Sequence, residues 1–178
     1  MRQIDRTSAL VALVLVLSLL PVYAPSAGAA GEPLILADLE GRPIPAVEVG
    51  RYHCEDFDFP RIHCYPSAAE LERAVARRLA PSASGSGPLT TSLATSYVRV
   101  YTDLFFGGAS AYLSVPYDDL SVIGWNDRIS SFQGLAGSGG AFFEHIYRGG
   151  FAYPFRAYQQ VTYVGDPYND KFSSVKPG

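Results

Sequence analysis

Two patterns in the second half of the chain occur twice, in the same order and at nearly the same spacing. Asn-Asp-Arg-Ile-Ser-Ser at 126–131 recurs 43 residues later as Asn-Asp-Lys-Phe-Ser-Ser at 169–174. Upstream, Tyr101-x(4)-Phe106-x-Gly108 recurs 41 residues later as Phe142-x(4)-Tyr147-x-Gly149. Two ordered signatures at one period indicate that a structural unit is duplicated. We expect the two copies at about residues 97–135 and 141–176.

The composition of the duplicated region favours β-structure. Tyr and Phe number 12 and 10 in the chain, and 17 glycines punctuate them. Tyr97–Tyr101 alternates as a strand, and Ala111–Val115 is typical of the next one. Glycine permits the backbone of a tight turn, over which an aromatic pair five residues apart can pack, and Trp125 is expected to fill the core. Two Greek-key units of about 40 residues that bury their inner faces form a sandwich, so we expect an all-β fold.

The combination of aromatic-x(4)-aromatic-x-Gly with Asn/Asp-Asn/Asp-x-x-Ser/Thr-Ser resembles the βγ-crystallin family. Both signatures appear twice within residues 96–178, while the resemblance does not extend to residues 31–90. It implies a βγ-crystallin-like double Greek-key sandwich, which we expect to be preceded by a small disulfide-stapled segment with one α-helix.

Resemblance to the microbial, calcium-binding members implies two Ca²⁺ sites of weak to moderate affinity, built across the pair of motifs. In such sites the third motif position gives its backbone carbonyl, the fifth its hydroxyl, and the carboxylate of the second position reaches the partner site. The expected metal-site residues are Arg128 and Ser130 crossed with Asp170, Lys171 and Ser173 crossed with Asp127, the amides Asn126 and Asn169, and turn carbonyls near Leu104 and His145. The alternative is that these polar residues only form turns through hydrogen bonds to their own backbone.

The first thirty residues have the pattern of a secretory signal peptide. A basic head with Arg2 and Arg6 precedes the apolar run Ala9–Leu20, and small residues follow up to Ala30. Twelve residues are too few for a membrane span, which needs about 20. We expect cleavage near residues 26–30, a secreted, extracellular or periplasmic protein, and no membrane span in the mature chain.

Residues 31–80 hold both cysteines, and a Ser/Gly/Pro-rich linker at 81–95 follows. In an exported chain, Cys54 and Cys64 are expected to form a disulfide. A zinc site using the adjacent His53 and His63 is the alternative. The Ser-Ala-Ala-Glu run at 67–70 fits a capping box, and Leu71, Val75 and Leu79 predict one helix at about 68–79. Val47–Cys54 alternates as a strand.

The sequence also limits the function. A net charge of −3 argues against nucleic-acid binding, and common catalytic motifs are missing, so we expect no enzyme. The leading hypothesis is a secreted calcium-binding βγ-crystallin-type protein with a structural, stress-related or interaction role. The alternative is a secreted metalloproteinase inhibitor of the same fold, whose partner is a peptidase. A third hypothesis gives a binding function to the apolar cluster of Phe57, Phe59, Ile62 and Tyr65, which is otherwise expected to pack inside the protein.

Overall fold

A computed structural model describes residues 34–80, 96–137 and 139–178. The predicted signal peptide at 1–30 and the predicted linker at 81–95 lie outside these residues. None of the helices in the described ranges is long and apolar enough to cross a membrane.

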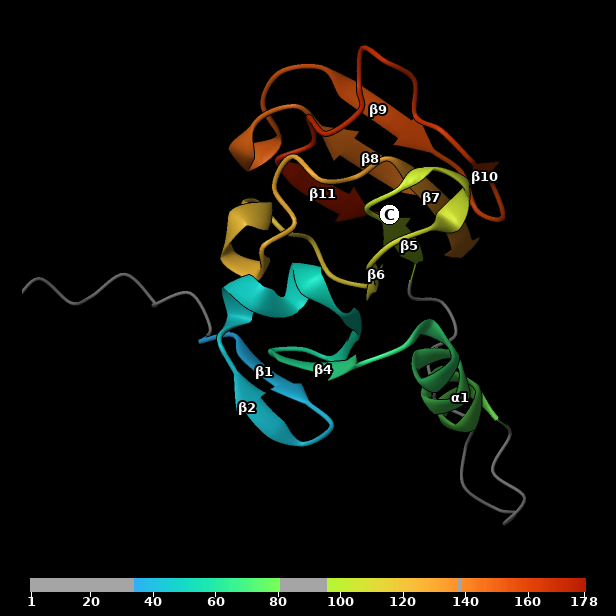
Figure 1. Cartoon of the computed structure of the whole chain (residues 1–178). Coiled ribbons are helices and arrows are strands. Elements are labelled where there is room, and N and C mark those ends of the chain that lie inside the picture. Colours follow the sequence, from blue (N-terminus) through green and yellow to red (C-terminus); the bar gives the residue numbers. More distant parts are fainter. Residues whose placement is uncertain (1–33, 81–95, 138) are drawn as a thin grey trace, which may run out of the picture. The chain divides into compact units, whose positions relative to one another are not determined.

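The duplicated region forms two Greek keys, as its sequence predicts (Figure 1). The strands of the first copy are β5 (Tyr97–Tyr101), β6 (Ser110–Leu113) and β7 (Ser131–Ala136). The strands of the second are β8 (Gly140–Phe143), β9 (Ala152–Phe155), β10 (Gln160–Val161) and β11 (Ser174–Pro177). Short 3-10 turns lie between them: η2 (Leu104–Phe106), η3 (Leu120–Ile123) and η4 (Ile146–Arg148).

Each copy contributes the segment that follows its second strand to the sheet of the other copy. Strand β10 pairs with β7 of the first copy, while Tyr117 of the first copy forms a bridge with Val175 of β11. The sheets therefore have the orders β10-β7-β5-β6 and β11-β8-β9, the second extended by the Tyr117 bridge. Neither sheet is complete without a segment of the other copy.

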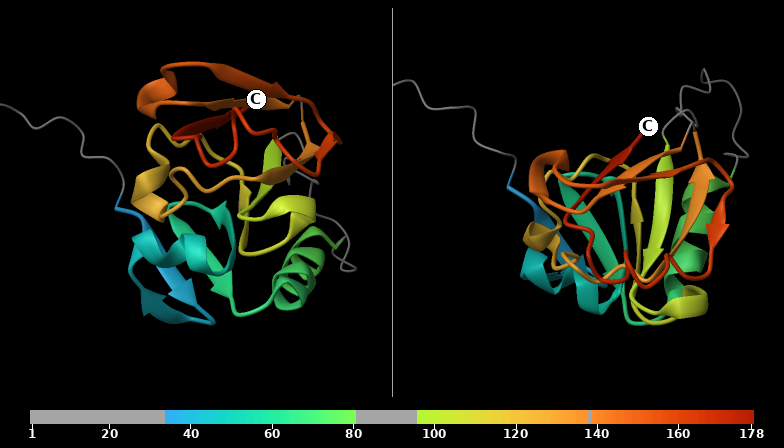
Figure 2. Two further views of the ribbon diagram at one scale, coloured as in Figure 1. Left: turned by 45° about the horizontal axis from the view of Figure 1, so that its top comes forward. Right: turned by 90° about the horizontal axis from the view of Figure 1, so that it is seen from above.

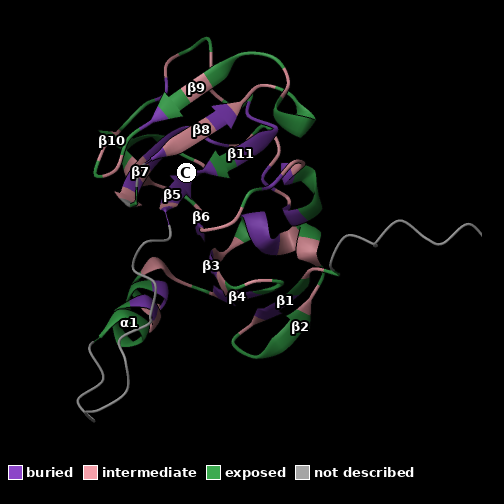
Figure 3. Ribbon diagram, turned by 180° about the vertical axis from the view of Figure 1, so that it is seen from behind, coloured by how far each residue is buried: buried purple, intermediate pink, exposed green. Residues whose placement is uncertain are grey.

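A buried aromatic cluster joins the inner faces of the two sheets. Figure 3 shows the buried parts of their strands in purple. Phe132 of β7 lies 5.1 Å from Phe142 of β8, centroid to centroid, and Phe142 stacks on Phe172 at the same distance. Trp125 is fully buried, which confirms the prediction that it fills the core.

Residues 34–80 extend the first sheet (Figure 2). They form β1 (Leu36–Leu39), β2 (Arg42–Ile44), the 3-10 turn η1 (Ala46–Arg51), β3 (His53–Asp58) and β4 (Arg61–Tyr65). Strand β3 pairs in parallel with β6, the edge strand of the first Greek key. The result is one continuous eight-stranded sheet with the order β10-β7-β5-β6-β3-β4-β1-β2.

The disulfide and the helix lie where the sequence predicts them. Cys54 and Cys64 face each other across β3 and β4 and are bonded. Helix α1 (Ala68–Leu79) begins at Ser67, whose Oγ accepts from the N–H of Glu70 and donates to that residue's carboxylate. Leu71 and Val75 are buried against Tyr112 of β6, whereas Leu79 is 41% exposed at the helix end.

One prediction for this segment is wrong. The alternating residues before Cys54 form the turn η1 rather than a strand, and β3 begins only at His53. Pro45 precedes the turn, and Gly50 lies within it in close contact with the loop at Gly124. A contact with a distant part of the chain thus outweighs the local alternation.

The apolar cluster of the N-terminal hairpin packs on the Greek key. The ring of Phe57 lies 5.4 Å from that of Tyr97 and 5.7 Å from that of Tyr112, and Phe59 lies 6.0 Å from Tyr117. Ile62 is 2% exposed. These contacts favour the packing interpretation over a free binding surface.

Asp56 is a buried carboxylate that ties β3 to the first Greek key. Its two oxygens accept from the N–H of Ser114 at 2.8 and 3.0 Å, and one also accepts from the hydroxyl of Tyr117 at 3.0 Å. Asp56 is 1% exposed. Burial raises its pKa from 3.8 to about 6, although the hydrogen bonds from Ser114 and Tyr117 oppose the shift.

This raised pKa makes stability fall as pH rises from about 4 to 6. Above pH 6 Asp56 is charged in both the folded and unfolded states, and the folded state carries the desolvation cost. Between the unfolded pKa of 3.8 and the folded pKa of about 6, Asp56 binds a proton in the folded state but not in the unfolded state. Protonation removes the buried charge and with it the desolvation cost. We predict that acidification from pH 7 to 4 stabilises the wild type relative to Asp56→Asn by about 2 kcal/mol. Urea unfolding of both proteins across this range measures the difference; parallel profiles would contradict the assignment.

Candidate metal centre

The two Asn-Asp-x-x-Ser-Ser motifs lie side by side and are crossed. Ser130 Oγ lies 3.3 Å from Asp170 Oδ1, and Ser173 Oγ lies 3.5 Å from Asp127 Oδ1. The backbones also meet, because the N–H of Asp127 donates to the carbonyl of Phe172 and that of Asp170 to the carbonyl of Ile129. Each motif therefore presents its carboxylate at the serine of the other, in the combination expected from the resemblance. Whether these groups bind an ion remains a prediction.

The local backbone of the two motifs is the same. Asp127 and Asp170 both have a φ of 54°, in the left-handed region that Asp tolerates better than most residues. The neighbouring amides Asn126 and Asn169 donate to the second carboxylate oxygen at 2.7 and 2.8 Å. The asparagine thus orients the aspartate and leaves the first oxygen directed at the serine.

The donor set fits a hard cation. Carboxylate, hydroxyl and amide oxygens, with exposed Asp127 and Asp170, are typical of Ca²⁺ sites, whose ligands are oxygens. Asn169 Oδ1 is buried and has no hydrogen-bond partner among the described residues. An unpaired amide oxygen beside a carboxylate is an arrangement that a cation would stabilise.

The sixth-position serines clamp the glycine turns to the motifs. Ser131 Oγ donates to the carbonyl of Asp103 at 2.6 Å and accepts from the N–H of Phe106. Ser174 Oγ donates to the carbonyl of His145 at 2.7 Å and accepts from the N–H of Arg148. The same two bonds occur in both copies.

These bonds correct the alignment of the two turns by one residue. Asp103, not Leu104, is the counterpart of His145. The residues with a positive φ support this alignment, because Phe105 and Phe106 in the first turn correspond to Tyr147 and Arg148 in the second. The turns are therefore 42 residues apart rather than 41, because aromatic residues occupy adjacent positions in the second copy and make the sequence alignment ambiguous.

The aromatic pair over the turn is present in the first copy only. Tyr101 and Phe106 are in contact, with centroids 5.3 Å apart. The corresponding pair predicted for the second copy is wrong, because Phe142 lies in the core and Tyr147 is 68% exposed.

The third motif positions carry positive side chains. Arg128 donates from Nη1 to the carbonyl of Gly124 at 3.2 Å, which anchors its guanidinium upstream of the motif. Lys171 is exposed and lines a small cavity with Glu144 and Tyr168. Both cations lie close to the expected sites in sequence, so electrostatics would weaken rather than strengthen binding.

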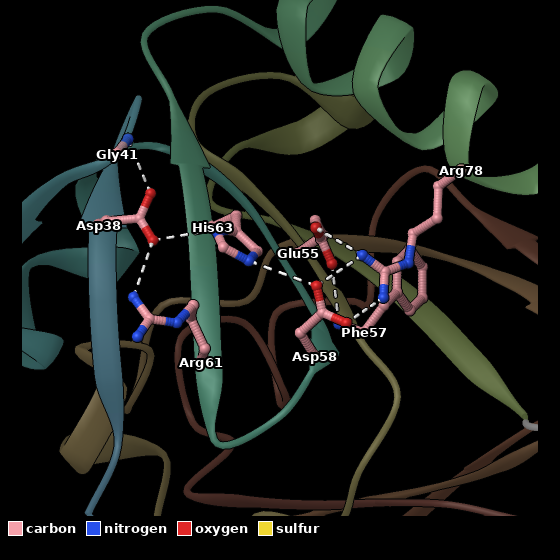
Figure 4. Close-up of polar contacts among 8 residues, drawn as sticks. All are labelled: Asp38, Gly41, Glu55, Phe57, Asp58, Arg61, His63 and Arg78. Carbon is pink, nitrogen blue, oxygen red and sulfur yellow. Dashed lines mark hydrogen bonds and ion pairs between the residues drawn. The ribbon is translucent and has the colours of Figure 1, made fainter.

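A second group of polar side chains lies on the N-terminal hairpin (Figure 4). Donor atoms of Glu55, Asp58 and His63 lie within 4.8 Å of one another and could hold a metal ion. His63 Nδ1 lies 2.9 Å from Asp38, and Nε2 lies 3.4 Å from Asp58. The sequence analysis missed this cluster, although the Cys54–Cys64 pairing places Glu55 opposite His63 in the hairpin.

Arg78 of helix α1 already neutralises this cluster. Its guanidinium bonds both oxygens of Asp58 and lies 3.8 Å from Glu55. The hydrogen bond to Arg78 lowers the pKa of Asp58, while burial raises that of Glu55. The network therefore holds α1 against the hairpin. The zinc site predicted as an alternative lacks thiolates, because both cysteines are in the disulfide.

Comparison with known proteins places the Greek keys in context. No family model and no curated protein matches the chain. Among solved structures, the chain is 23% identical to a βγ-crystallin from an archaeon, over 47% of this chain and 99% of that one, with a TM-score of 0.42. It is 30% identical to a double mutant of a βγ-crystallin domain from Clostridium beijerinckii, over 45% and 93%, with a TM-score of 0.39. A clostrillin double mutant in complex with nickel is 27% identical, over 45% and 94%, with a TM-score of 0.39.

These three matches cover nearly all of each solved structure but under half of this chain. The chain carries both signatures of this family twice and folds them into two Greek keys, and it belongs to the βγ-crystallin family.

The clamping serines provide a test of the site's architecture. Ser131 and Ser174 are fully buried, and replacing either with Ala removes two hydrogen bonds, one to a carbonyl and one from an N–H of the glycine turn. We predict that each variant loses about 1–3 kcal/mol of unfolding free energy. The exposed Ser121→Ala serves as the control and should change little. Chemical denaturation of the three variants measures the losses, and a loss no larger than that of the control would refute the clamp.

Proposed function

We propose that the protein is a secreted, non-catalytic βγ-crystallin-type protein that binds calcium to stabilise its fold in a structural, stress-related or interaction role. The observation that carries the proposal is the crossed placement of Asp127 at Ser173 and of Asp170 at Ser130. Two symmetric pairs of oxygen donors from segments 43 residues apart are more than turn formation requires.

The expected affinity is low. Each site has one carboxylate, with Arg128 or Lys171 in the same motif, and extracellular modules of this charge bind Ca²⁺ at about 10⁻⁴–10⁻³ M. Secretion is supported by the pattern of residues 1–30 and by the Cys54–Cys64 disulfide, which is typical of oxidising compartments. Outside the cell, the calcium concentration would then be high enough for a weak site to bind the ion.

The inhibitor alternative gains no support from the fold. The resemblance to secreted metalloproteinase inhibitors implies disulfides within the Greek keys, whereas the only two cysteines lie in β3 and β4. We therefore retain calcium binding as the proposed function.

Calcium titration tests the proposal. An ion that binds only the folded state adds about 2.7 kcal/mol at a hundredfold excess over its Kd. We predict a rise in melting temperature with millimolar Ca²⁺ that is absent in the Asp127→Ala/Asp170→Ala double variant. Asp119→Ala/Asp166→Ala makes the same change of charge outside the motifs and should keep the response. Absence of both a melting shift and a calorimetric heat in the wild type would refute calcium binding.

A further inference from the structure

The turn η1 approaches the loop of the first motif with no room for a side chain. A Cβ at Gly50 would lie 2.1 Å from the carbonyl oxygen of Gly124, and a Cβ at Gly124 would lie 2.1 Å from the carbonyl oxygen of Val47. Both distances are far below any real contact. The backbones of the N-terminal segment and the Greek key are therefore in direct contact at this point.

Gly124 connects this contact to the motif. It has a φ of 68° and ends η3 by donating its N–H to that turn. Its carbonyl accepts from Arg128, whose Nη1 would also lie 2.8 Å from a Cβ at Gly50. Trp125, between Gly124 and the motif, is fully buried. A displacement of Gly124 would thus be transmitted to Asn126–Arg128 rather than absorbed by a loose loop.

The other side of η1 is held by the hairpin. Val49 is 1% exposed, and its carbonyl oxygen lies 3.4 Å from Cys54 Sγ. The carbonyl of Tyr52, directly after η1, accepts from the N–H of Ser110 in β6. Pairing of β3 with β6 continues this attachment. The turn is fixed between the disulfide-bonded hairpin and the first motif.

The second motif has a different environment. Gly165, the glycine that precedes it, would place a Cβ no closer than 3.8 Å to Pro167 and 4.0 Å to Tyr168, both in its own loop. Among the described residues, close backbone contact with the N-terminal segment is therefore a property of the first motif.

We infer that η1 is a brace that sets the geometry of the first motif, so that docking of the N-terminal segment and calcium binding are coupled. The inference rests on the proposed function. The first motif supplies Arg128 and Ser130 to one expected site and Asp127 to the other, so both sites depend on the brace. Coupling is reciprocal: if the brace strengthens calcium binding, calcium strengthens the attachment of the brace.

Two valine-to-alanine variants test the brace, because they remove atoms and so introduce no steric overlap. The quantity measured is the affinity of each variant for calcium. Val49 in η1 and Val75 in helix α1 are both buried valines of the N-terminal segment, and only Val49 belongs to the brace. We expect Val49→Ala to weaken Ca²⁺ binding about five- to tenfold and Val75→Ala to leave it unchanged. Isothermal titration on the secreted protein, well below its unfolding temperature, separates affinity from stability.

A glycine pair provides a second, stronger perturbation. Gly50→Ala drives the brace away from Gly124, whereas Gly134→Ala creates an equally short approach, 2.2 Å to the carbonyl oxygen of Arg156, away from η1. We expect calcium affinity to fall in the first and not in the second. If either glycine variant does not fold, the valine pair still decides the question.

Hydrogen exchange measures the reciprocal effect. Amides of residues 46–52 should exchange more slowly in Ca²⁺ in the wild type, and this response should vanish in Asp127→Ala/Asp170→Ala. If the wild type binds no calcium, the proposed function fails and the coupling with it. If the wild type binds calcium but Val49→Ala and Val75→Ala bind it equally, the coupling alone is overturned.

Discussion

The exchange of the Tyr117 segment and strand β10 between the two Greek keys is the constraint on which the other features depend. Because Tyr117 pairs with Val175 and β10 pairs with β7, each sheet is completed by the other copy. The same exchange brings the two motifs together, since their aspartates bond the backbone of the opposite motif. A single copy could not bury the aromatic cluster, and it could not place a carboxylate at its own serine. The duplication is therefore a physical requirement of both the core and the candidate site.

The N-terminal segment pairs with an edge strand that this exchange leaves open. Strand β6 is an edge strand of the first sheet, and an unpaired edge invites association with other chains. Pairing with β3 covers it, and the buried Asp56 secures the join through Ser114 and Tyr117. Tyr117 thus serves both joins, because its backbone bridges the copies while its hydroxyl bonds the N-terminal segment.

The sequence predicts those features whose signals are local. The duplicated motifs, the capping box at Ser67 and the Cys54–Cys64 pair each have a chemical role within a few residues, and the fold confirms them. The parallel pairing of β3 with β6 has no such signal, because it depends on contacts between residues more than 50 positions apart. The turn η1 was missed for the same reason. Adjacent aromatic residues in the second copy allow two alignments of the glycine turns. The sequence alone therefore pairs His145 with Leu104, whereas the structure pairs it with Asp103. The cluster of Glu55, Asp58 and His63 becomes visible only when the hairpin register is known.

The two motifs have nearly the same internal geometry but different surroundings, and this difference argues for a division of roles. Asp127 and Asp170 share one backbone conformation and one asparagine contact. Among the residues that the structure describes, however, the first motif is the one in close backbone contact with a segment from outside the Greek keys, through Gly124 and Arg128. Position 124 therefore requires glycine for two reasons. Its φ lies in the left-handed region, and the contact with η1 leaves no room for a side chain. This doubly constrained residue connects the first motif to the N-terminal segment, whereas Lys171 of the second motif is exposed. The duplicated motifs thus share one internal geometry, while the N-terminal segment makes their environments unequal.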